Sequence, residues 1–316
     1  MQHIIRSCAA IAAAIMLFFA PPQVANAFPD EGLKLIVAYG AGGGTDVTAR
    51  LLAKDLEATI GHPVTVENIT GGGGWTGWSA LANAQPDGYT IGYINVPNIY
   101  AGFLNPEMSR SENLSSFTPL MNHVTDYCVW AVSADSPFHS VADVIEAAKA
   151  EALSIAAHGF GGDDHLAIMR MERMTDASFN VIHNTSTAIS LTQVLGGHVQ
   201  VLGANVSEVI KLHEAGELRV IGVMAPERSK FLPDVPTFKE QGFDQVWSVS
   251  RGIAAPAGLP DDVKQILIKA LKETLSSDAH RNAAEQLGLS LDIIEGEEYA
   301  KFLADTEGEV KTLMGW

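Results

Sequence analysis

Cysteine is nearly absent from this sequence, with only Cys8 and Cys128 among 316 residues. Cys8 precedes the apolar part of the N-terminal segment, whereas a lipoprotein cysteine would stand at its end. If that segment is removed, Cys128 is left alone and cannot form an internal disulfide. Flanked by Tyr127 and Val129, it is most simply a buried core residue. The chain must therefore fold on its hydrophobic core, which 47% hydrophobic residues can supply, and its length indicates two domains.

Basic residues are also scarce, with 20 lysines and arginines against 37 aspartates and glutamates and a formal net charge of −17. This balance keeps a protein soluble and disfavours nucleic acids and anionic membrane surfaces as partners. An anionic ligand would have to be attracted locally, by backbone N–H groups and the positive ends of helices. Glycine turns at helix starts are therefore the places where we expect a ligand site.

Apolar runs long enough to span a bilayer are absent after the N-terminal segment. That segment has the features of an export signal: a positive start at Arg6, an apolar middle from Ile11 to Phe19 and the small-residue pattern Ala25-Asn26-Ala27. We expect cleavage after Ala27, so that residues 1–27 are a signal peptide and the mature protein is periplasmic. A retained membrane anchor is the alternative, but Pro21-Pro22 follow the apolar segment directly.

The first structural unit of the mature chain is a strand, a glycine turn and a helix. Leu33–Tyr39 is a short apolar run of the kind found in buried parallel strands, and Gly40–Asp46 is the turn. Apolar residues on one face of Val47–Ile60 predict a helix that ends at Gly61.

The turn is suited to an anion. Gly42, Gly43 and Gly44 have no side chains to cover their backbone N–H groups, which lie at the positive end of the helix. Thr45 or Asp46 can cap that helix.

The same pattern recurs once. Leu153–Ala157 is the predicted strand, His158–Asp164 the glycine turn and His165–Met174 the helix. The repetition predicts two similar lobes that face each other. We place lobe 1 at residues 28–126 and 249–316 and lobe 2 at residues 127–248.

Strands and helices alternate along most of the chain, which favours an α/β fold with parallel sheets. The other predicted strands are Pro63–Asn68, Tyr89–Ile94, Val129–Val132, Asn180–His183, Val199–Leu202, Arg219–Met224 and Gly252–Ala255. The other predicted helices are Ser79–Ala84, Val141–Ala150, Ala188–Leu195, Val206–Glu214, Asp261–Ser276, Ala279–Gln286 and Glu297–Leu313. We expect no regular structure at Gly71–Gly74, and loops with short helical pieces over Asn95–Pro119.

Cofactor motifs are incomplete. Gly40-Ala41-Gly42 follows a strand and opens a helix, but Thr45 stands where the third glycine of a dinucleotide fingerprint would be. No Gly-Lys-Ser/Thr follows for a phosphate loop, and Ser79 lacks the second glycine of a hydrolase elbow. We expect no cofactor.

Asp163, Asp164 and His165 cluster beside His158, and residues of these types could bind a hard metal ion. Their spacing, however, matches no recognisable metal-binding motif. Carboxylates that cap a helix explain the pair equally well. A secreted hydrolase or lyase that uses His165 with Asp163 or Asp164 remains an alternative function.

From Phe28 onward the chain resembles the periplasmic solute-binding receptors of tripartite tricarboxylate transporters, the Bug receptor family. The stretches that carry the resemblance, in order, are IVAYGAGGGTDVTARLLAKDLEATIGHPVTVENITGGGG, QPDGYTIGY, SPFHSVADVIEAAKA, GFGGDDHLA, LTQVLGGHVQV, LPDVPTFKEQGF and RGIAAPAGLP.

The resemblance implies a periplasmic-binding-protein-like fold: two lobes, each with a central mainly parallel sheet flanked by helices, and a ligand cleft between them. It implies a non-enzymatic, monomeric receptor without a cofactor, which binds a small mono-, di- or tricarboxylate and hands it to the membrane subunits of a transporter. A sensor that reports its ligand to a membrane kinase is an alternative role for the same fold.

The resemblance also implies ligand contacts, made largely by backbone N–H groups and ordered waters. The residues at the matching positions are Tyr39, Gly42, Gly43, Gly44, Thr45, Asp46, Gly72 and Gly73 in lobe 1, and Gly159, Gly161, Gly162, Asp163, His165, Asn184, Thr185 and Ser186 in lobe 2.

Two departures bear on the ligand. Many family members have Tyr, then Lys or Arg, then Gly where this chain has His183 to Ser186, so a cationic contact is missing. Asp163 stands where many members have Ser or Thr, and it can cap its helix, bind a hydroxyl or amino group, or point away. Arg251 could supply a charge near the hinge, although a surface ion pair is a more ordinary role.

Overall fold

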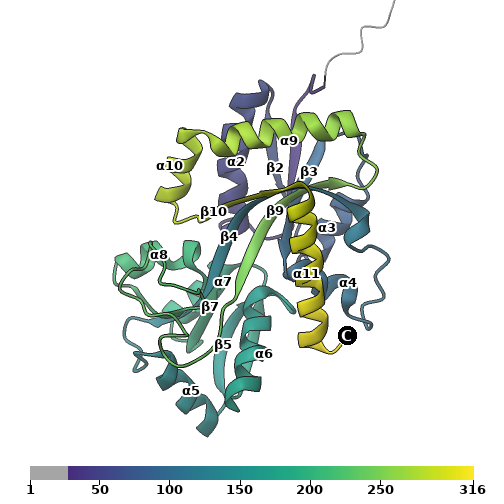
Figure 1. Cartoon of the computed structure of the whole chain (residues 1–316). Helices are drawn as coiled ribbons and strands as arrows, with labels where there is room; N and C mark the ends of the chain where they lie inside the picture. The colour runs from purple at the N-terminus through teal and green to yellow at the C-terminus, as the bar shows by residue number, and fades with distance from the viewer. Residues whose placement is uncertain (1–27) are drawn as a thin grey trace, which may run out of the picture.

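The computed structural model describes residues 28–316, so the predicted signal peptide lies outside the described residues. One ten-stranded sheet runs through the molecule, and helices flank it in two lobes (Figure 1). The strands β4 and β9 pass from the upper lobe of the view to the lower one, so they form the connection between the lobes. This arrangement confirms the predicted two-lobed α/β fold.

The strands are β1 (Leu33–Val37), β2 (Val64–Asn68), β3 (Thr90–Val96), β4 (Phe117–Ser133), β5 (Leu153–His158), β6 (Phe179–Asn184), β7 (Val201–Asn205), β8 (Leu218–Val223), β9 (Ser248–Pro256) and β10 (Leu291–Glu295). The helices are α2 (Gly44–Ile60), α3 (Trp75–Ala82), α4 (Asn98–Leu104), α5 (Val141–Ala150), α6 (Asp163–Thr175), α7 (Thr187–Leu195), α8 (Val206–Glu214), α9 (Asp261–Ser276), α10 (Asp278–Gln286) and α11 (Gly296–Met314), with single 3₁₀ turns at Gly72–Gly74 and Leu114–Ser116.

The sheet is parallel toward its two ends and antiparallel in the middle. Its main order is β2-β1-β3-β9-β4-β7-β5-β6. Strand β1 pairs in parallel with β2 and β3, and β5 does so with β6 and β7. The middle strands β9 and β4 run antiparallel to each other and to their neighbours β3 and β7. The carboxyl ends of β1 and β5 therefore carry the two glycine turns to the junction of the lobes.

Strand β4 is far longer than the predicted Val129–Val132. It begins at Phe117, inside the stretch expected to consist of loops, and β10 was not predicted at all. The polar residues Asn122, His123 and Asp126 interrupt its apolar pattern, yet all three are buried. A pattern of hydrophobic residues cannot predict their burial, because they are buried against polar partners rather than apolar ones.

The four consecutive glycines are ordered, so the prediction of no regular structure there was wrong. Gly71, Gly72, Gly73 and Gly74 all have positive φ, and the last three form a 3₁₀ turn. A Cβ on Gly74 would lie 2.8 Å from the Trp78 ring. The turn leads directly into α3, which therefore begins four residues before the predicted Ser79.

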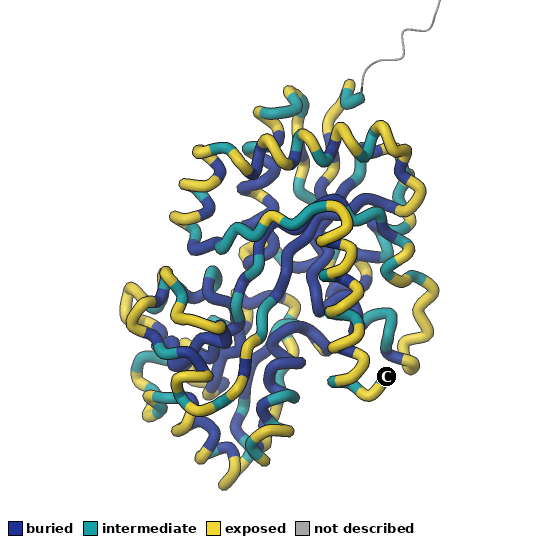
Figure 2. Tube along the Cα trace, viewed as in Figure 1, coloured by how far each residue is buried: buried dark blue, intermediate teal, exposed yellow. Residues whose placement is uncertain are grey.

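Each lobe has its own hydrophobic core, visible as buried strands beneath helices whose outer faces are exposed (Figure 2). In the first lobe Leu52 of α2 and Leu271 of α9 pack with β1, and Tyr299 of α11 joins the same core. In the second lobe Trp130 of β4 packs on one face of the sheet and Val129 on the other. Cys128 is buried, as predicted.

A hydrogen-bonded series of four polar side chains runs through the first lobe and links α10 to α2. The Tyr93 hydroxyl lies 2.7 Å from His123 Nδ1, His123 Nε2 lies 2.9 Å from His280 Nε2, and His280 Nδ1 lies 2.8 Å from Asp55 Oδ2. Because the Asp55 carboxylate accepts, His280 Nδ1 carries a proton, and each group in turn donates toward Asp55. Both imidazoles are therefore satisfied in their neutral forms.

This hydrogen-bonded series predicts that stability falls in acid. Burial lowers the pKa of His123 well below its usual value and also lowers the pKa of His280, although Asp55 opposes the second shift. Below about pH 6.5 the unfolded state binds more protons at these residues than the folded state does, so the stabilisation is complete above that pH and lost as the pH falls. We expect urea unfolding to give a free energy lower by on the order of 1 kcal/mol or more at pH 5 than at pH 7.5. The dependence should be shallower in His280→Asn, and equal dependence in both proteins would contradict this assignment.

Candidate functional site

Two cavities that share lining residues lie where the lobes meet. The outer cavity has a volume of about 160 Å³ and is lined by Ala38, Tyr39, Thr70, Gly71, Gly73, Gly74, His158, Gly159, Phe160, His183, Asn184 and Thr185. The inner cavity, of about 10 Å³, is lined by Tyr39, Thr45, Asn95, Asn98, His158, Asp163, Asn205, Glu208, Val249 and Arg251. Tyr39 and His158 line both, with ring centroids 4.1 Å apart, so they stand between the two cavities.

The two lobes touch across this cleft. Asn98 of α4 holds the start of α6, because its Nδ2 donates to Asp163 Oδ1 (2.9 Å) and its Oδ1 accepts from the Asp163 N–H (3.1 Å). The glycine turns also meet, since a Cβ on Gly159 would lie 3.4 Å from the Cα of Gly73. The second predicted turn, His158–Asp164, therefore faces the glycine run Gly71–Gly74 of the first lobe.

The first glycine turn, Gly40–Asp46, is held by hydrogen bonds between its own residues. Helix α2 begins at Gly44 with Gly43 as its N-cap, so the prediction that Thr45 or Asp46 caps the helix was wrong. Asp46 instead accepts the Gly42 N–H (2.9 Å) and pairs with Arg50. Burial alone would raise the pKa of Asp46, but the hydrogen bonds from Arg50 and Gly42 outweigh it and lower that pKa.

The starts of α2 and α6 keep free donors. Among residues 28–316, the N–H groups of Thr45 and Asp46 have no hydrogen-bond acceptor, and neither do those of Asp164 and His165. These are the second and third N–H groups of each helix, which are left unpaired by helix geometry. Two positive helix ends with unpaired donors thus approach the cleft from opposite lobes.

His165 lies in the first turn of α6, and its ring bonds back to the second glycine turn. Its Nδ1 accepts the Gly161 N–H at 2.9 Å, and its ring packs against Phe160 and His183. Burial, with His183 nearby, lowers the pKa of His165 to about 4, so the ring is neutral at pH 7. The structure therefore does not assemble the predicted alternative of His165 with Asp163 or Asp164 through a hydrogen bond in the described part of the chain.

The predicted ligand residues fall into three groups. Tyr39, Gly73, Gly159, Asn184 and Thr185 line the outer cavity, and Thr45 and Asp163 line the inner one. Two neighbouring surface hollows are lined by Gly42 and Gly44, and by Gly72. The remainder lie within the turns or at helix starts beside the cleft, and these are Gly43, Asp46, Gly161, Gly162, His165 and Ser186.

Arg251 is the main residue that the sequence reading misjudged. It is not on the surface: its side chain and that of Asp126 are each 1% exposed and form an ion pair of 2.8 Å. Burial raises the pKa of Asp126, while Arg251 and Ser207 act in the opposite direction. The Nε of Arg251 has no hydrogen-bond partner among the described residues. Charged residues inside otherwise apolar strands were the signal that could have revealed this pair.

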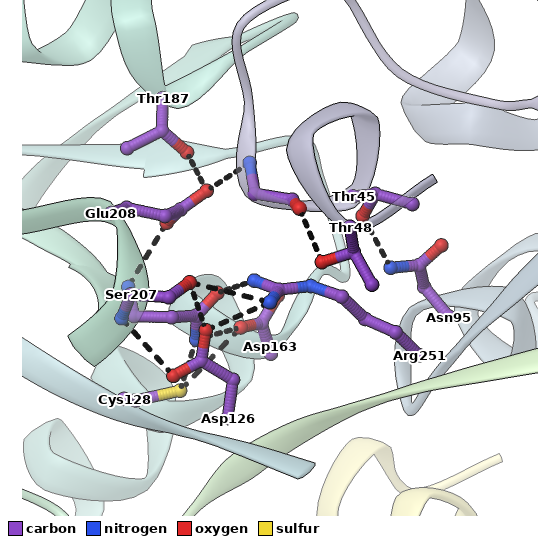
Figure 3. A network of polar contacts seen from close by, with 12 residues as sticks. Thr45, Thr48, Asn95, Asp126, Cys128, Asp163, Thr187, Ser207, Glu208 and Arg251 are labelled. Atoms are coloured by element: carbon purple, nitrogen blue, oxygen red, sulfur yellow. Dashed lines mark hydrogen bonds and ion pairs between the residues drawn. The ribbon is translucent and has the colours of Figure 1, made fainter. Parts of the chain in front are cut away.

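Glu208 of α8 was also missed, and it reaches across the cleft (Figure 3). Its Oε1 accepts from the Gly44 N–H (2.9 Å) and the Thr187 hydroxyl (2.8 Å), and its Oε2 accepts from the Asn205 N–H (3.0 Å). Asn205 in turn donates to Asp163 at 2.9 Å. The Glu208 carboxylate, from the second lobe, therefore accepts the hydrogen bond of the first N–H group of α2.

A metal centre receives little support from the donor chemistry. The structure brings together Cys128, Asp163 and Asp164, whose ligand atoms lie within 4.8 Å of one another. Burial raises the pKa of Cys128 and of Asp164 well above their usual values, and Asp163 adds to both shifts. Cys128 therefore holds its proton at neutral pH, and a cation would have to displace it.

A sheet shared by two lobes with a cleft between them defines a solute-binding protein of the periplasmic type. The structure of periplasmic binding protein BugD superposes with a TM-score of 0.85 at 27% identity, over 91% of this chain and 98% of that one. A TctC solute binding protein from Polaromonas gives 0.68 at 28% identity, over 91% and 99%. MatC from Rhodopseudomonas palustris, solved with bound malate, shares the fold with a TM-score of 0.84 at 22% identity, over 90% and 99%.

The family follows from the sequence match. Residues 48–315 match the tripartite tricarboxylate transporter family receptor, and the chain belongs to this family. A UPF0065 protein from Cupriavidus necator is 29% identical, over 97% of this chain and 94% of that protein. Protein BugT from Bordetella pertussis is 28% identical, over 90% and 89%. Within residues 28–316, no helix combines the length and the apolar character needed to cross a membrane.

Proposed function

We propose that this chain is an exported receptor that captures a small organic carboxylate and delivers it to the permease of a tripartite tricarboxylate transporter. The mature protein begins at Phe28, is a periplasmic monomer and uses no cofactor and no catalytic step. Its ligand lies between lobe 1 (residues 28–126 and 249–316) and lobe 2 (residues 127–248).

The observation that carries the proposal is the pair of helix starts at the cleft. Helices α2 and α6 come from opposite lobes, and each offers two unpaired backbone N–H groups. No lysine or arginine lines the outer cavity among the described residues. A carboxylate at the two helix starts is held by N–H groups and helix dipoles, as expected for a protein whose net charge repels anions.

Closure makes these weak donors effective. When the lobes meet, water leaves the cleft and the local dielectric constant falls, so each hydrogen bond to the carboxylate gains strength. The ligand binds only the closed form well and therefore shifts the population toward it. The permease then distinguishes the loaded receptor by its closed shape.

The first test is a thermal-shift screen with mono-, di- and tricarboxylates. Malate and adipate belong in it because two proteins of the same fold were solved with these acids. A ligand at 100 times its dissociation constant stabilises by about 2.7 kcal/mol, which raises the melting temperature by several degrees. We expect at least one acid to do so. A screen in which no acid moves the transition would contradict the proposal.

A further inference from the structure

The outer cavity has the size and the walls of a site for one flat ring. Its volume is about 160 Å³, and an engineered apolar cavity of about 150 Å³ binds benzene. Rings line it in two pairs, Tyr39 with His158 at a centroid distance of 4.1 Å and Phe160 with His183 at 5.7 Å. Side chains of this kind contact a further ring by stacking or by edge-to-face packing.

Backbone forms much of the remaining wall. The lining residues without a side chain come from both lobes, and they are Gly71, Gly73, Gly74 and Gly159. A Cβ on Gly159 would lie 3.4 Å from the Cα of Gly73, so the two lobes meet at these glycines. Because glycine has no Cβ, a flat group can approach the peptide planes closely here.

The same cavity carries no formal charge. Among the residues that the structure describes, no aspartate, glutamate, lysine or arginine lines it. Burial lowers the pKa of His158 and that of His183, so both imidazoles are neutral at pH 7.5. A charged group that entered the cavity would lose water without gaining a partner of opposite sign. The cavity is therefore poorly suited to a second carboxylate.

The outer cavity adjoins the helix starts at which the proposed function places the ligand carboxylate. Thr45 of α2 and Asp163 of α6 line the inner cavity, and Tyr39 and His158 line both cavities. A carboxylate bonded directly to a ring in the outer cavity can therefore point past these two side chains toward the helix starts.

We propose that the outer cavity binds an uncharged aromatic ring, so that the receptor selects an aromatic monocarboxylate over an aromatic dicarboxylate and over an aliphatic acid. The carboxylate of this ligand lies at the starts of α2 and α6, and its ring packs against Tyr39, Phe160 and the glycine backbone. This inference rests on the proposed function and narrows its ligand class.

Two physical differences favour such a ligand. A rigid ring has no internal rotations to lose on binding, whereas an aliphatic chain gives up several. A second carboxylate would be dehydrated in a neutral cavity, inside a protein whose formal net charge is −17. A nitro group has nearly the shape of a carboxylate but no net charge. Comparing 4-nitrobenzoate with terephthalate therefore separates the charge of the second group from its size.

The experiment is isothermal titration of the mature protein at pH 7.5 with benzoate, heptanoate, 4-nitrobenzoate and terephthalate. Benzoate and heptanoate have the same charge and the same number of carbon atoms, so their comparison isolates the ring. We expect benzoate to bind at least about tenfold more tightly than heptanoate. We expect 4-nitrobenzoate to bind at least about tenfold more tightly than terephthalate.

Thr185→Lys tests the neutral lining through a gain of binding. Thr185 is exposed and lines the outer cavity, so a lysine there supplies a cation for the second carboxylate of terephthalate. The affinity for terephthalate relative to 4-nitrobenzoate should rise at least about tenfold. Thr192→Lys adds the same charge at an exposed position of α7 that does not line the cavity, and it should leave this ratio unchanged.

The wild-type comparisons need no variant, so the test stands if Thr185→Lys folds poorly, which circular dichroism would reveal. Terephthalate that binds as tightly as 4-nitrobenzoate overturns the inference, and so does heptanoate that binds as tightly as benzoate. An unchanged ratio in folded Thr185→Lys overturns the neutral lining as the cause of selection. If none of the four acids binds, the inference is overturned, and the proposed function falls with it only if the thermal-shift screen is also blank.

Discussion

Gly161→Ala should nearly abolish ligand binding while leaving both lobes folded. Gly161 has a φ of +71°, and a Cβ built on it would lie 2.1 Å from the Cβ of Ala101. Ala101 belongs to α4 in the first lobe and Gly161 to the turn of the second lobe, so the clash arises only when the lobes meet. The open form relieves it at no cost to either core. We expect at least a hundredfold loss of affinity, or about 2.7 kcal/mol.

The matched control for this variant is Gly197→Ala. Gly197 also has a φ of +71°, but nothing lies within 4 Å of the position of its Cβ. It should share the backbone strain of about 1–2 kcal/mol and keep wild-type affinity. Titration with the acid that gives the largest thermal shift measures binding, and small-angle X-ray scattering without ligand measures opening. Equal affinity and equal radius of gyration in both variants would show that the lobes do not close through this contact.

Arg251→Met should be the most destabilising single substitution at the hinge. It leaves Asp126 1% exposed without its cation, and it removes the hydrogen bonds from Arg251 to Ser207 and Asn205. Removing one partner of a buried ion pair typically costs 3–5 kcal/mol, since a charge is left uncompensated in a low dielectric. We expect a loss of about that size in the free energy of urea unfolding.

The double variant Asp126→Leu with Arg251→Met separates the two causes. If the cost comes from the abandoned carboxylate, removing it as well should restore much of the stability. Additive losses in the double variant would instead show that shape and hydrogen bonding to Ser207 matter more than charge. A cost below about 1 kcal/mol for the single variant would contradict the buried-pair account.

The parts of the fold that could be predicted are those encoded locally. The glycine turns at Gly40–Asp46 and His158–Asp164 follow apolar strands and precede amphipathic helices, so neighbouring residues suffice to identify them. Helices α5, α8 and α9 also have the predicted bounds, because their apolar periodicity and end signals lie within the helices and beside them.

The parts that could not be predicted depend on contacts between distant residues. Gly44 and Glu208 are 164 residues apart in sequence, and neither position carries a local sign of their hydrogen bond. The same holds for Arg251 and Asp126, which meet because β4 and β9 pair across the hinge. A single sequence therefore reveals the glycine turns, but the buried charges around them come from the tertiary structure.

The central claim is that one carboxylate lies between the starts of α2 and α6. A crystal structure of the mature protein with the acid identified by the thermal-shift screen tests it most directly. The account predicts carboxylate oxygens at about 2.7–3.2 Å from backbone N–H groups of both glycine turns, one from each lobe. An acid bound to one lobe alone, or outside the cleft lined by Tyr39 and His158, would contradict it.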